Sequence, residues 1–200
     1  MSALRAVIVA SGGANTASLQ FALKRLQVDS EVSADAAQIR AASHVILPGV
    51  GAAADAMHRL RQSALDSIIP TLEQPVLGIC LGMQLLFDES AEGDVHCLGI
   101  IPGRAERFAP AAGRPVPHMG WNTLTPGQPC ALLEGIADGD YAYFVHSYAI
   151  GIGAATVASC GYGAPFSACV QWRNFYGAQF HPERSAAVGA RLLKNFLSMH

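Results

Sequence analysis

Short, mostly apolar runs recur along the first half of the chain. Aliphatic and β-branched residues gather there in runs of five to seven, most of which lack the alternation of a half-exposed strand. Runs of this kind predict strands that are covered on both faces, as in a parallel sheet. The predicted strands are AVIVA (6–10), SEVSA (30–34), SHVILPG (43–49) and PVLGIC (75–80).

Amphipathic segments between these runs predict helices. Apolar residues recur at i, i+3, i+4 and i+7 in Leu19, Ala22, Leu23 and Leu26, and Asn15 is placed to cap the start of that helix. Further helices are predicted near 53–61, 63–69 and 81–88, and a last one over 186–198. Strands that alternate with helices indicate an α/β fold with a mainly parallel central sheet and helices on both faces.

The second half of the chain is richer in strand-like segments. The turn residues Arg173 and Asn174 separate the last two segments, which predicts a hairpin and an antiparallel elaboration of the sheet. We see no linker and no internal repeat, so we expect one domain over residues 1–200. The segments are LGIIPG, PHMGWNTL, YAYFVHSYAI, ATVASC and SACVQW followed by FYGAQF.

Composition and charge exclude several classes of protein. Hydrophobic residues make up 51% of the chain, charged residues 14%, and the net charge is −2, without a basic run that would bind nucleic acid. No apolar stretch reaches the about 18 residues of a membrane span. The lack of such a stretch and of a signal-peptide core predicts a cytoplasmic location. The five cysteines show no paired or zinc-binding spacing, so we expect no disulfides and no metal, and we expect no cofactor.

Cys80 lies between two glycines in the sequence GICLG, where a predicted strand passes into a predicted helix. A G-x-nucleophile-x-G turn is sharp, and glycines two residues to either side relieve crowding around the nucleophile. The following helix points its N-terminal N–H groups at the sulfur, which favours the thiolate. Taken alone, the pattern also fits an inert buried cysteine with two packing glycines.

A histidine and a glutamate near the C-terminus supply the partners that a nucleophilic cysteine needs. In FHPERS, Pro182 keeps His181 extended, so His181 and Glu183 face the same side of the chain. Glu183 can then bind one imidazole nitrogen while the other faces the thiol. We therefore predict a Cys80–His181–Glu183 catalytic triad.

A glycine-flanked loop follows the third predicted strand, in LPGVGA. Its backbone can approach a substrate carbonyl closely, so Val50 or Gly51 is expected to donate to an oxyanion together with the Leu81 N–H. Gln84, one helical turn beyond Cys80, is expected to reach the substrate from the same side.

These motifs together resemble the class I, triad-type glutamine amidotransferases. The blocks GICLGMQ, PGVG and HPE carry that resemblance, and further blocks in order from residue 47 to 197 resemble the glutaminase subunits of imidazole glycerol phosphate synthases. PHMGWN and YFVHSYA distinguish these subunits from other triad amidotransferases. One departure is Ala10, where the family commonly has Asp before its first glycine turn.

The resemblance implies a flavodoxin-like amidotransferase domain that hydrolyses L-glutamine to glutamate and ammonia through a cysteinyl thioester. It implies that Gly49, Gly51, Gln84 and the segment His146, Ser147 and Tyr148 contact glutamine. It also implies a heterodimer with a (β/α)₈-barrel cyclase that receives the ammonia, with Met119, Trp121, Asn122 and Asn15 at the interface. The alternatives are another triad amidotransferase, a free-standing γ-glutamyl hydrolase or a non-catalytic binding module on the same fold.

Overall fold

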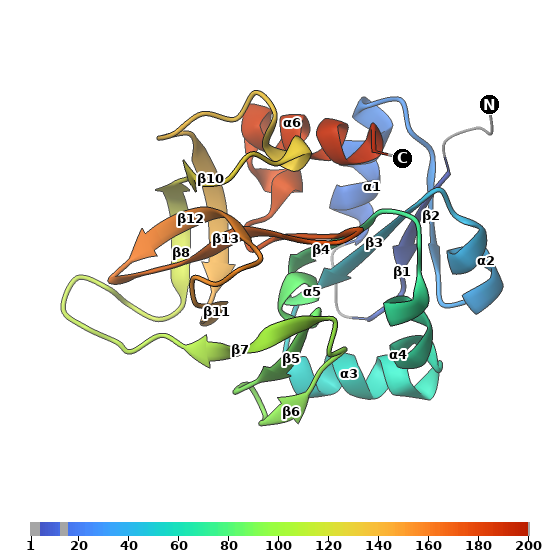
Figure 1. The fold of residues 1–200 in the computed structure, drawn as a ribbon, viewed down its shortest axis with the longest axis horizontal. Coiled ribbons are helices and arrows are strands. Elements are labelled where there is room, and N and C mark those ends of the chain that lie inside the picture. Colours follow the sequence, from blue (N-terminus) through green and yellow to red (C-terminus); the bar gives the residue numbers. More distant parts are fainter. Residues whose placement is uncertain (1–4, 13–15, 200) are drawn as a thin grey trace.

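An eight-stranded sheet forms the centre of the computed structural model, which describes residues 5–12 and 16–199. Its order is β2-β1-β3-β4-β14-β13-β12-β9 (Figure 1). Five neighbouring strands are parallel, and the order 2-1-3-4 is that of the expected flavodoxin-like domain. These strands are β2 (Ser30–Ser33), β1 (Ala6–Val9), β3 (His44–Gly49), β4 (Val76–Cys80) and β14 (Phe175–Ala178).

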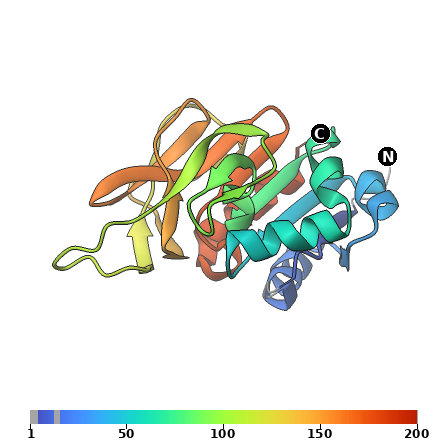
Figure 2. The same cartoon turned by 90° about the horizontal axis from the view of Figure 1, so that it is seen from below.

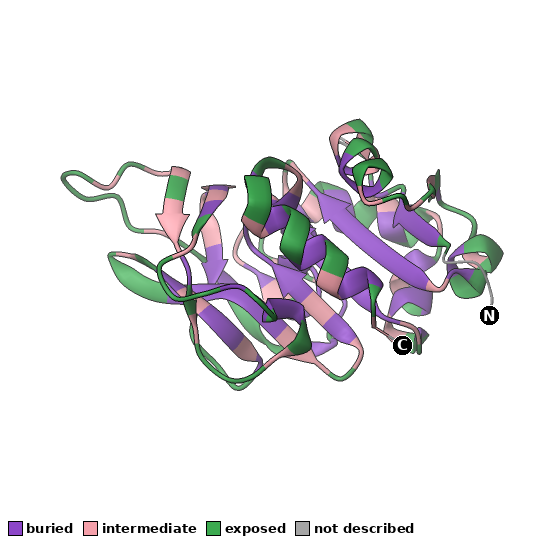
Figure 3. Ribbon diagram, turned by 90° about the horizontal axis from the view of Figure 1, so that it is seen from above, coloured by how far each residue is buried: buried purple, intermediate pink, exposed green. Residues whose placement is uncertain are grey.

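Helices cover both faces of the parallel strands, as predicted. One face carries α1 (Thr16–Arg25) and α6 (Ala186–Leu197). The other carries α2 (Ala36–Ala41), α3 (Ala53–Gln62) and α4 (Leu65–Ile68), and Figure 2 shows α3 lying across this face. Buried residues follow the strands and exposed residues the outer sides of the helices (Figure 3). In the described part of the chain, no helix is long and apolar enough to cross a membrane.

The second half adds the predicted antiparallel elaboration. β13 (Ala164–Trp172) and β14 form the hairpin expected at Arg173 and Asn174, and β12 (Thr156–Tyr162) and β9 (Thr125–Pro126) extend the same sheet. A second sheet pairs β8 (His118–Thr123) with β10 (Tyr141–His146). A third contains β11 (Tyr148–Ile150), β7 (Ile101–Arg107), β5 (Phe87–Ser90) and β6 (Val95–His96). Short 3₁₀ turns lie at Ile69–Thr71, Ala131–Leu133 and Pro182–Arg184.

The helix predicted over 81–88 is wrong in length, because α5 spans only Leu81–Gln84. The backbone carbonyl of Leu85 accepts from the N–H of Leu98, and that of Leu86 accepts from Ile100 and Ile101. These long-range bonds take carbonyl groups that a longer helix would use internally, and β5 begins at Phe87 instead. The field of this single turn is correspondingly smaller than that of the predicted two-turn helix.

The strand-like segment YAYFVHSYAI also differs from the prediction, because it divides between two sheets. β10 ends at His146, and β11 begins at Tyr148 and pairs with β7. Ser147 lies at the junction, where its carbonyl accepts from the N–H of Phe108 at 3.0 Å. The division places residues 146–148 at the inner edge of both sheets, beside the carboxyl ends of β3 and β4.

Candidate active site

A cavity of about 420 Å³ lies at the carboxyl ends of β3 and β4. In open α/β sheets ligands bind outside the carboxyl ends of the strands, and here the strand order reverses next to β3, between β1 and β3. The cavity contains every residue predicted for the triad, the oxyanion donors and the substrate contacts. They are Cys80, His181, Glu183, Leu81, Val50, Gly49, Gly51, Gln84, His146, Ser147 and Tyr148.

Cys80 is the last residue of β4 and has φ 53° and ψ −112°. A positive φ is uncommon for a residue with a Cβ, and such strained positions cluster at functional sites. The sharp turn predicted from the sequence is therefore present, and the strain falls on the cysteine itself. The side chain is 6% exposed and lines the cavity.

The two flanking glycines provide space rather than unusual backbone angles. A Cβ at Gly78 would lie 2.7 Å from the backbone of Gly82 and Met83, and one at Gly82 would overlap the carbonyl oxygen of Leu47. The turn after Cys80 therefore packs directly against β3. Any side chain at either position would push the thiol away from its present place.

His181 and Glu183 form the predicted pair. His181 Nδ1 lies 2.9 Å from Glu183 Oε1, and both side chains are nearly buried, at 12% and 10% exposure. Burial by itself would lower the pKa of His181, but hydrogen bonds and charge from Cys80 and Glu183 outweigh it and raise the pKa to about 10. At neutral pH the imidazole is therefore protonated beside the sulfur.

Two further hydrogen bonds hold the sulfur in place. The Cys80 thiol points to the Val145 carbonyl at 3.7 Å, and Gln179 Nε2 donates to the sulfur at 3.8 Å. Gln84 Nε2 in turn donates to Gln179 Oε1 at 3.0 Å and to the Tyr148 carbonyl at 2.8 Å. Gln84 lines the cavity as predicted, but its amide nitrogen is already occupied by these two acceptors.

Two buried histidines bond to each other at the cavity wall: His146, which lines the cavity, and His118, which does not. His146 Nδ1 is 2.8 Å from the Tyr148 carbonyl, and His146 Nε2 is 3.0 Å from His118 Nδ1. Burial lowers the pKa of His118 to about 4 and that of His146 to about 3. Both imidazoles are therefore neutral at pH 7, in contrast to His181.

Three polar residues of the site were not predicted from the sequence. Glu92 lines the cavity from the loop after β5, and its Oε2 accepts from the Ala53 N–H at 3.1 Å. Gln179 follows β14 and contacts the sulfur, and Arg184 follows the triad glutamate at the cavity wall. Glu92 stands alone in the sequence, whereas Gln179 and Arg184 flank the HPE motif in AQFHPERS, and that position beside His181 and Glu183 is the signal that could have indicated them.

The residues predicted for a partner interface lie mainly on β8. Met119 is 67% exposed and Trp121 is 52% exposed, which is unusual for side chains of this size and hydrophobicity. Asn122 points inward instead, donating to the Gly161 carbonyl at 2.9 Å. Asn15, also predicted for the interface and as a helix cap, lies outside the described residues.

Metal-binding side chains do not gather in the described part of the chain. No group of three His, Cys, Asp or Glu residues lies there at a spacing that would hold an ion. Within the cavity, His146 bonds to His118 and to the Tyr148 carbonyl, and His181 bonds to Glu183 and to Cys80. The polar side chains that line the cavity carry a thiol, imidazoles, carboxylates, an amide, hydroxyls and a guanidinium.

A cysteine on a strained strand-to-helix turn, facing a histidine that a carboxylate orients, is the arrangement of cysteine-dependent acyl-transfer enzymes. The family model described as "Glutamine amidotransferase class-I" matches residues 7–199. Two relatives show similarity over nearly the whole chain. The imidazole glycerol phosphate synthase subunit HisH of Xanthomonas euvesicatoria pv. vesicatoria is 54% identical, and that of Xylella fastidiosa (strain Temecula1) is 52% identical. Each alignment covers 192 residues, 96% of this chain and 96% of the relative.

The chain therefore belongs to the class I glutamine amidotransferase family, and within it to the HisH subunits of imidazole glycerol phosphate synthase. Solved structures show the same fold at low identity. A structure described as a glutamine amidotransferase has a TM-score of 0.74 at 21% identity and covers 96% of both chains. A glutamine amidotransferase from Thermotoga maritima has a TM-score of 0.68 at 16% identity, with 98% of this chain and 83% of the other chain covered.

Proposed function

We infer that this chain is the glutaminase subunit of imidazole glycerol phosphate synthase, which hydrolyses L-glutamine to glutamate and ammonia. The observation that carries the inference is the cavity in which Cys80, on its strained turn, meets the His181–Glu183 pair. The membership in the HisH family identifies the larger enzyme to which this activity belongs.

In the first half of the reaction, the Cys80 sulfur, having passed its proton to His181, attacks the side-chain amide carbon of glutamine as a thiolate. The carbonyl oxygen becomes an oxyanion, which backbone N–H groups at Leu81 and at Val50 or Gly51 stabilise. Each well-placed donor of this kind contributes on the order of 10²–10³ in rate. Because His181 is protonated at neutral pH, it can give its proton to the departing nitrogen, so that ammonia leaves and a glutamyl thioester remains.

In the second half, water replaces ammonia in the site. The oxygen of the water attacks the thioester carbonyl carbon, and His181, now neutral, accepts a proton from that water. The carbon–sulfur bond then breaks, glutamate is released, and the thiolate beside the imidazolium is restored. Glu183 keeps the ring oriented in both halves through its 2.9 Å bond to Nδ1.

The α-carbon of glutamine carries an ammonium and a carboxylate group, and these require groups of opposite charge in the cavity. We assign the α-ammonium group to Glu92, because one of its oxygens accepts from Ala53 and the carboxylate lines the cavity. Burial raises the pKa of Glu92, and a nearby cation offsets this cost by favouring the charged form. Backbone and side-chain groups of Gly49, Gly51, Gln84 and residues 146–148 would contact the rest of the amino acid.

The ammonia product calls for a nearby acceptor, because free ammonia becomes protonated in neutral water and loses its nucleophilicity. We propose that a (β/α)₈-barrel cyclase subunit docks on β8, over Met119 and Trp121, and receives the ammonia there. Asn15 belongs to the same proposed interface, and Asn122 supports it from the inner side of β8 through its bond to the Gly161 carbonyl. All five cysteines, which lie in the described part of the chain, are unpaired. This agrees with a reducing, cytoplasmic location.

The test is steady-state release of glutamate and ammonia by the chain alone and in complex with the cyclase and its nucleotide ligand. We expect low turnover alone and strong stimulation in the complex. In the complex, Glu92→Gln should raise KM for glutamine about tenfold, because it removes a charge-assisted bond. Equal turnover with and without the partner would contradict the subunit function, and an unchanged KM would contradict the role of Glu92.

A further inference from the structure

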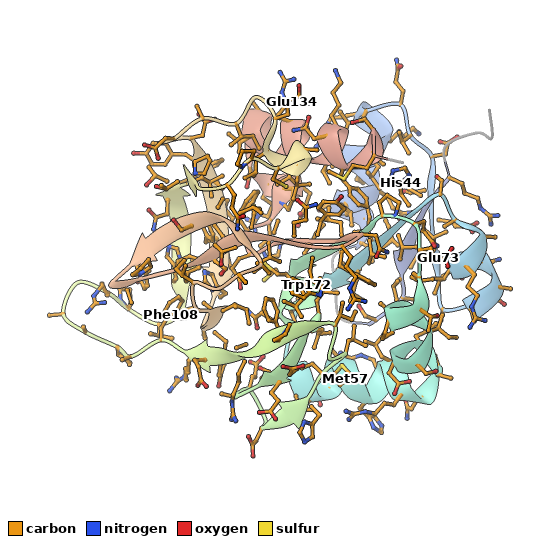
Figure 4. The ribbon with its side chains drawn as sticks, viewed as in Figure 1. His44, Met57, Glu73, Phe108, Glu134 and Trp172 are labelled. Atoms are coloured by element: carbon orange, nitrogen blue, oxygen red, sulfur yellow. The ribbon has the colours of Figure 1, made fainter. Side chains whose placement is uncertain are left out.

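Two buried histidines connect β8 with the wall of the cavity. His118 and His146 are cross-strand partners at the end of the β8–β10 ladder. They are 4% and 6% exposed, and neither takes part in the chemistry described above. Their rings are held on several sides by aromatic groups. His118 stacks between Phe144 and Tyr162, with ring centroids 5.1 Å and 4.1 Å away, and His146 packs against Phe108, labelled in Figure 4, at 5.2 Å.

Hydrogen bonds at the β8 end determine which nitrogen of His118 carries its proton. The Asn122 Nδ2 group lies 2.9 Å from the Gly161 carbonyl and 3.2 Å from His118 Nε2. Its Oδ1 accepts from the Thr123 N–H at 2.8 Å, which fixes the orientation of the amide. His118 Nε2 therefore accepts from Asn122, so a neutral His118 carries its proton on Nδ1.

The position of the proton on His118 determines the position of the proton on His146, and the bond from His146 to Tyr148 requires the same position. His118 Nδ1–H donates to His146 Nε2 at 3.0 Å, so His146 carries its proton on Nδ1. That N–H meets the Tyr148 carbonyl at 2.8 Å, and a carbonyl can only accept. The Gly161 carbonyl at one end and the Tyr148 carbonyl at the other thus require the same tautomer in both rings.

The histidine pair is connected to the active site through the Tyr148 carbonyl, which accepts from His146. This carbonyl also accepts from Gln84 Nε2 at 2.8 Å, and Gln84 continues through Gln179 to the Cys80 sulfur. Ser147 and Tyr148 bridge two different sheets and line the cavity. The bond from His146 to the Tyr148 carbonyl spans that junction, since His146 ends β10 and Tyr148 begins β11.

We propose that His118 and Asn122 are positioning residues of the glutamine site. They fix the tautomer and the ring orientation of His146, and His146 holds the Tyr148 carbonyl and with it the cavity wall at Ser147 and Tyr148. The proposal rests on the glutaminase function, because it concerns the binding of glutamine. Alternation along β8 places His118 and Asn122 inside, whereas Met119 and Trp121 face outward.

The test uses the full chain in complex with the cyclase and compares three variants. His118→Phe keeps a flat ring between Phe144 and Tyr162 but cannot donate to His146. His118→Asn places an N–H donor near the former Nδ1 position. His44→Phe is the matched control, since His44 is also a buried histidine, 2% exposed, whose ring meets Phe196 at 5.2 Å outside the cavity.

We expect His118→Phe to raise KM for glutamine about tenfold, because it leaves a buried acceptor unpaired, and to change kcat by less than about threefold. His118→Asn should recover most of the loss in KM, and His44→Phe should leave KM and kcat unchanged. An unchanged KM in His118→Phe would overturn the proposal. So would a rise in KM of the same size in His44→Phe, which would indicate a general effect of losing a buried histidine.

Long-range ¹H–¹⁵N NMR of the unmodified protein at pH 7 tests the same proposal even if His118→Phe does not fold. We expect both His118 and His146 to carry the proton on Nδ1, and a proton on Nε2 of His146 would overturn the proposal. Failure of the glutaminase function would be seen separately, as a wild-type complex that releases no glutamate while the NMR assignment still holds.

Discussion

The three histidines of the site differ in charge at neutral pH because their hydrogen-bond partners differ, although burial affects all three. His181 faces a carboxylate and a thiol and is charged at neutral pH, whereas His118 and His146 face a carbonyl, an amide and each other and are neutral. Burial alone would make all three neutral. The charge of His181 is therefore a consequence of Glu183 and Cys80, which makes it available as an acid toward the leaving ammonia.

Glu183→Gln should show this dependence directly. The amide keeps the size of the side chain but removes the charge, so the pKa of His181 should fall from about 10 toward its ordinary value near 6.5. The imidazolium would then deprotonate at lower pH, and kcat at neutral pH should fall about 10²-fold or more. NMR titration of His181 and steady-state kinetics measure both effects.

Glu134→Gln is the control for this substitution, because Glu134 is an exposed glutamate outside the cavity (labelled in Figure 4). It should leave the titration of His181 and kcat unchanged. An unaltered His181 titration in Glu183→Gln would show that Glu183 does not set the charge of the ring.

The sequence could indicate the site residues that belong to a local motif, but not those that do not. Cys80, His181 and Glu183 stand in short patterns whose geometry follows from neighbouring glycines and a proline, so their positions could be predicted. Glu92 comes from a loop, and only the packing of distant segments brings it to the cavity. The partnership of His118 with His146 likewise depends on the register of β8 and β10.

At the scale of elements, the turn after Cys80 is the most closely packed connection to the site. α5 lies against the end of β3, with no room for a side chain at Gly82, and this contact determines where the Leu81 N–H and the thiol lie. The apolar pattern predicted the strand correctly but made the helix too long. Local periodicity cannot show that Leu98, Ile100 and Ile101 bind the carbonyls of Leu85 and Leu86.

Gly82→Ala should therefore destabilise the protein and impair activity. Its Cβ would overlap the Leu47 carbonyl, and overpacking of this kind costs about 1–3 kcal/mol. Gly153→Ala is the control, because a Cβ there meets nothing within 4 Å, and it should change the free energy of unfolding by less than about 0.5 kcal/mol. Urea unfolding measures the difference, and equal stability of the two variants would contradict the packing argument.

At the scale of the whole molecule, the cavity adjoins the exposed aromatic surface of one small sheet, because Val145, which lines the cavity, is the cross-strand partner of Met119. β10 ends at His146, which lines the cavity wall. Met119 and Trp121 of β8 and Tyr141 of β10 are exposed. The Trp121 ring also packs edge-on against Tyr143, at 5.8 Å, which holds it in place at the surface. A partner bound here would lie beside the cavity, because Arg184 of the cavity wall covers the Tyr143 ring at 4.5 Å.

Trp121→Ala should weaken the complex with the cyclase by about 30-fold, as expected for a central interface tryptophan. The fold of the isolated chain should be retained, because the side chain is half exposed. Ile152→Ala removes a similarly exposed apolar group from another surface and should leave Kd unchanged. Calorimetric titration measures both constants, and an equal loss of affinity in the two variants would exclude β8 as the docking surface.

Cys80 alone among the five cysteines should be the nucleophile toward glutamine, and the whole proposed mechanism depends on this. It can be measured by intact-mass and peptide mass spectrometry after treatment of the complex with a chloroketone analogue of L-glutamine. We predict one adduct, on Cys80, which excess glutamine prevents and which is absent from Cys80→Ala, a variant that should release no glutamate. An adduct on another cysteine with Cys80 unmodified, or normal glutamate release by Cys80→Ala, would contradict the mechanism.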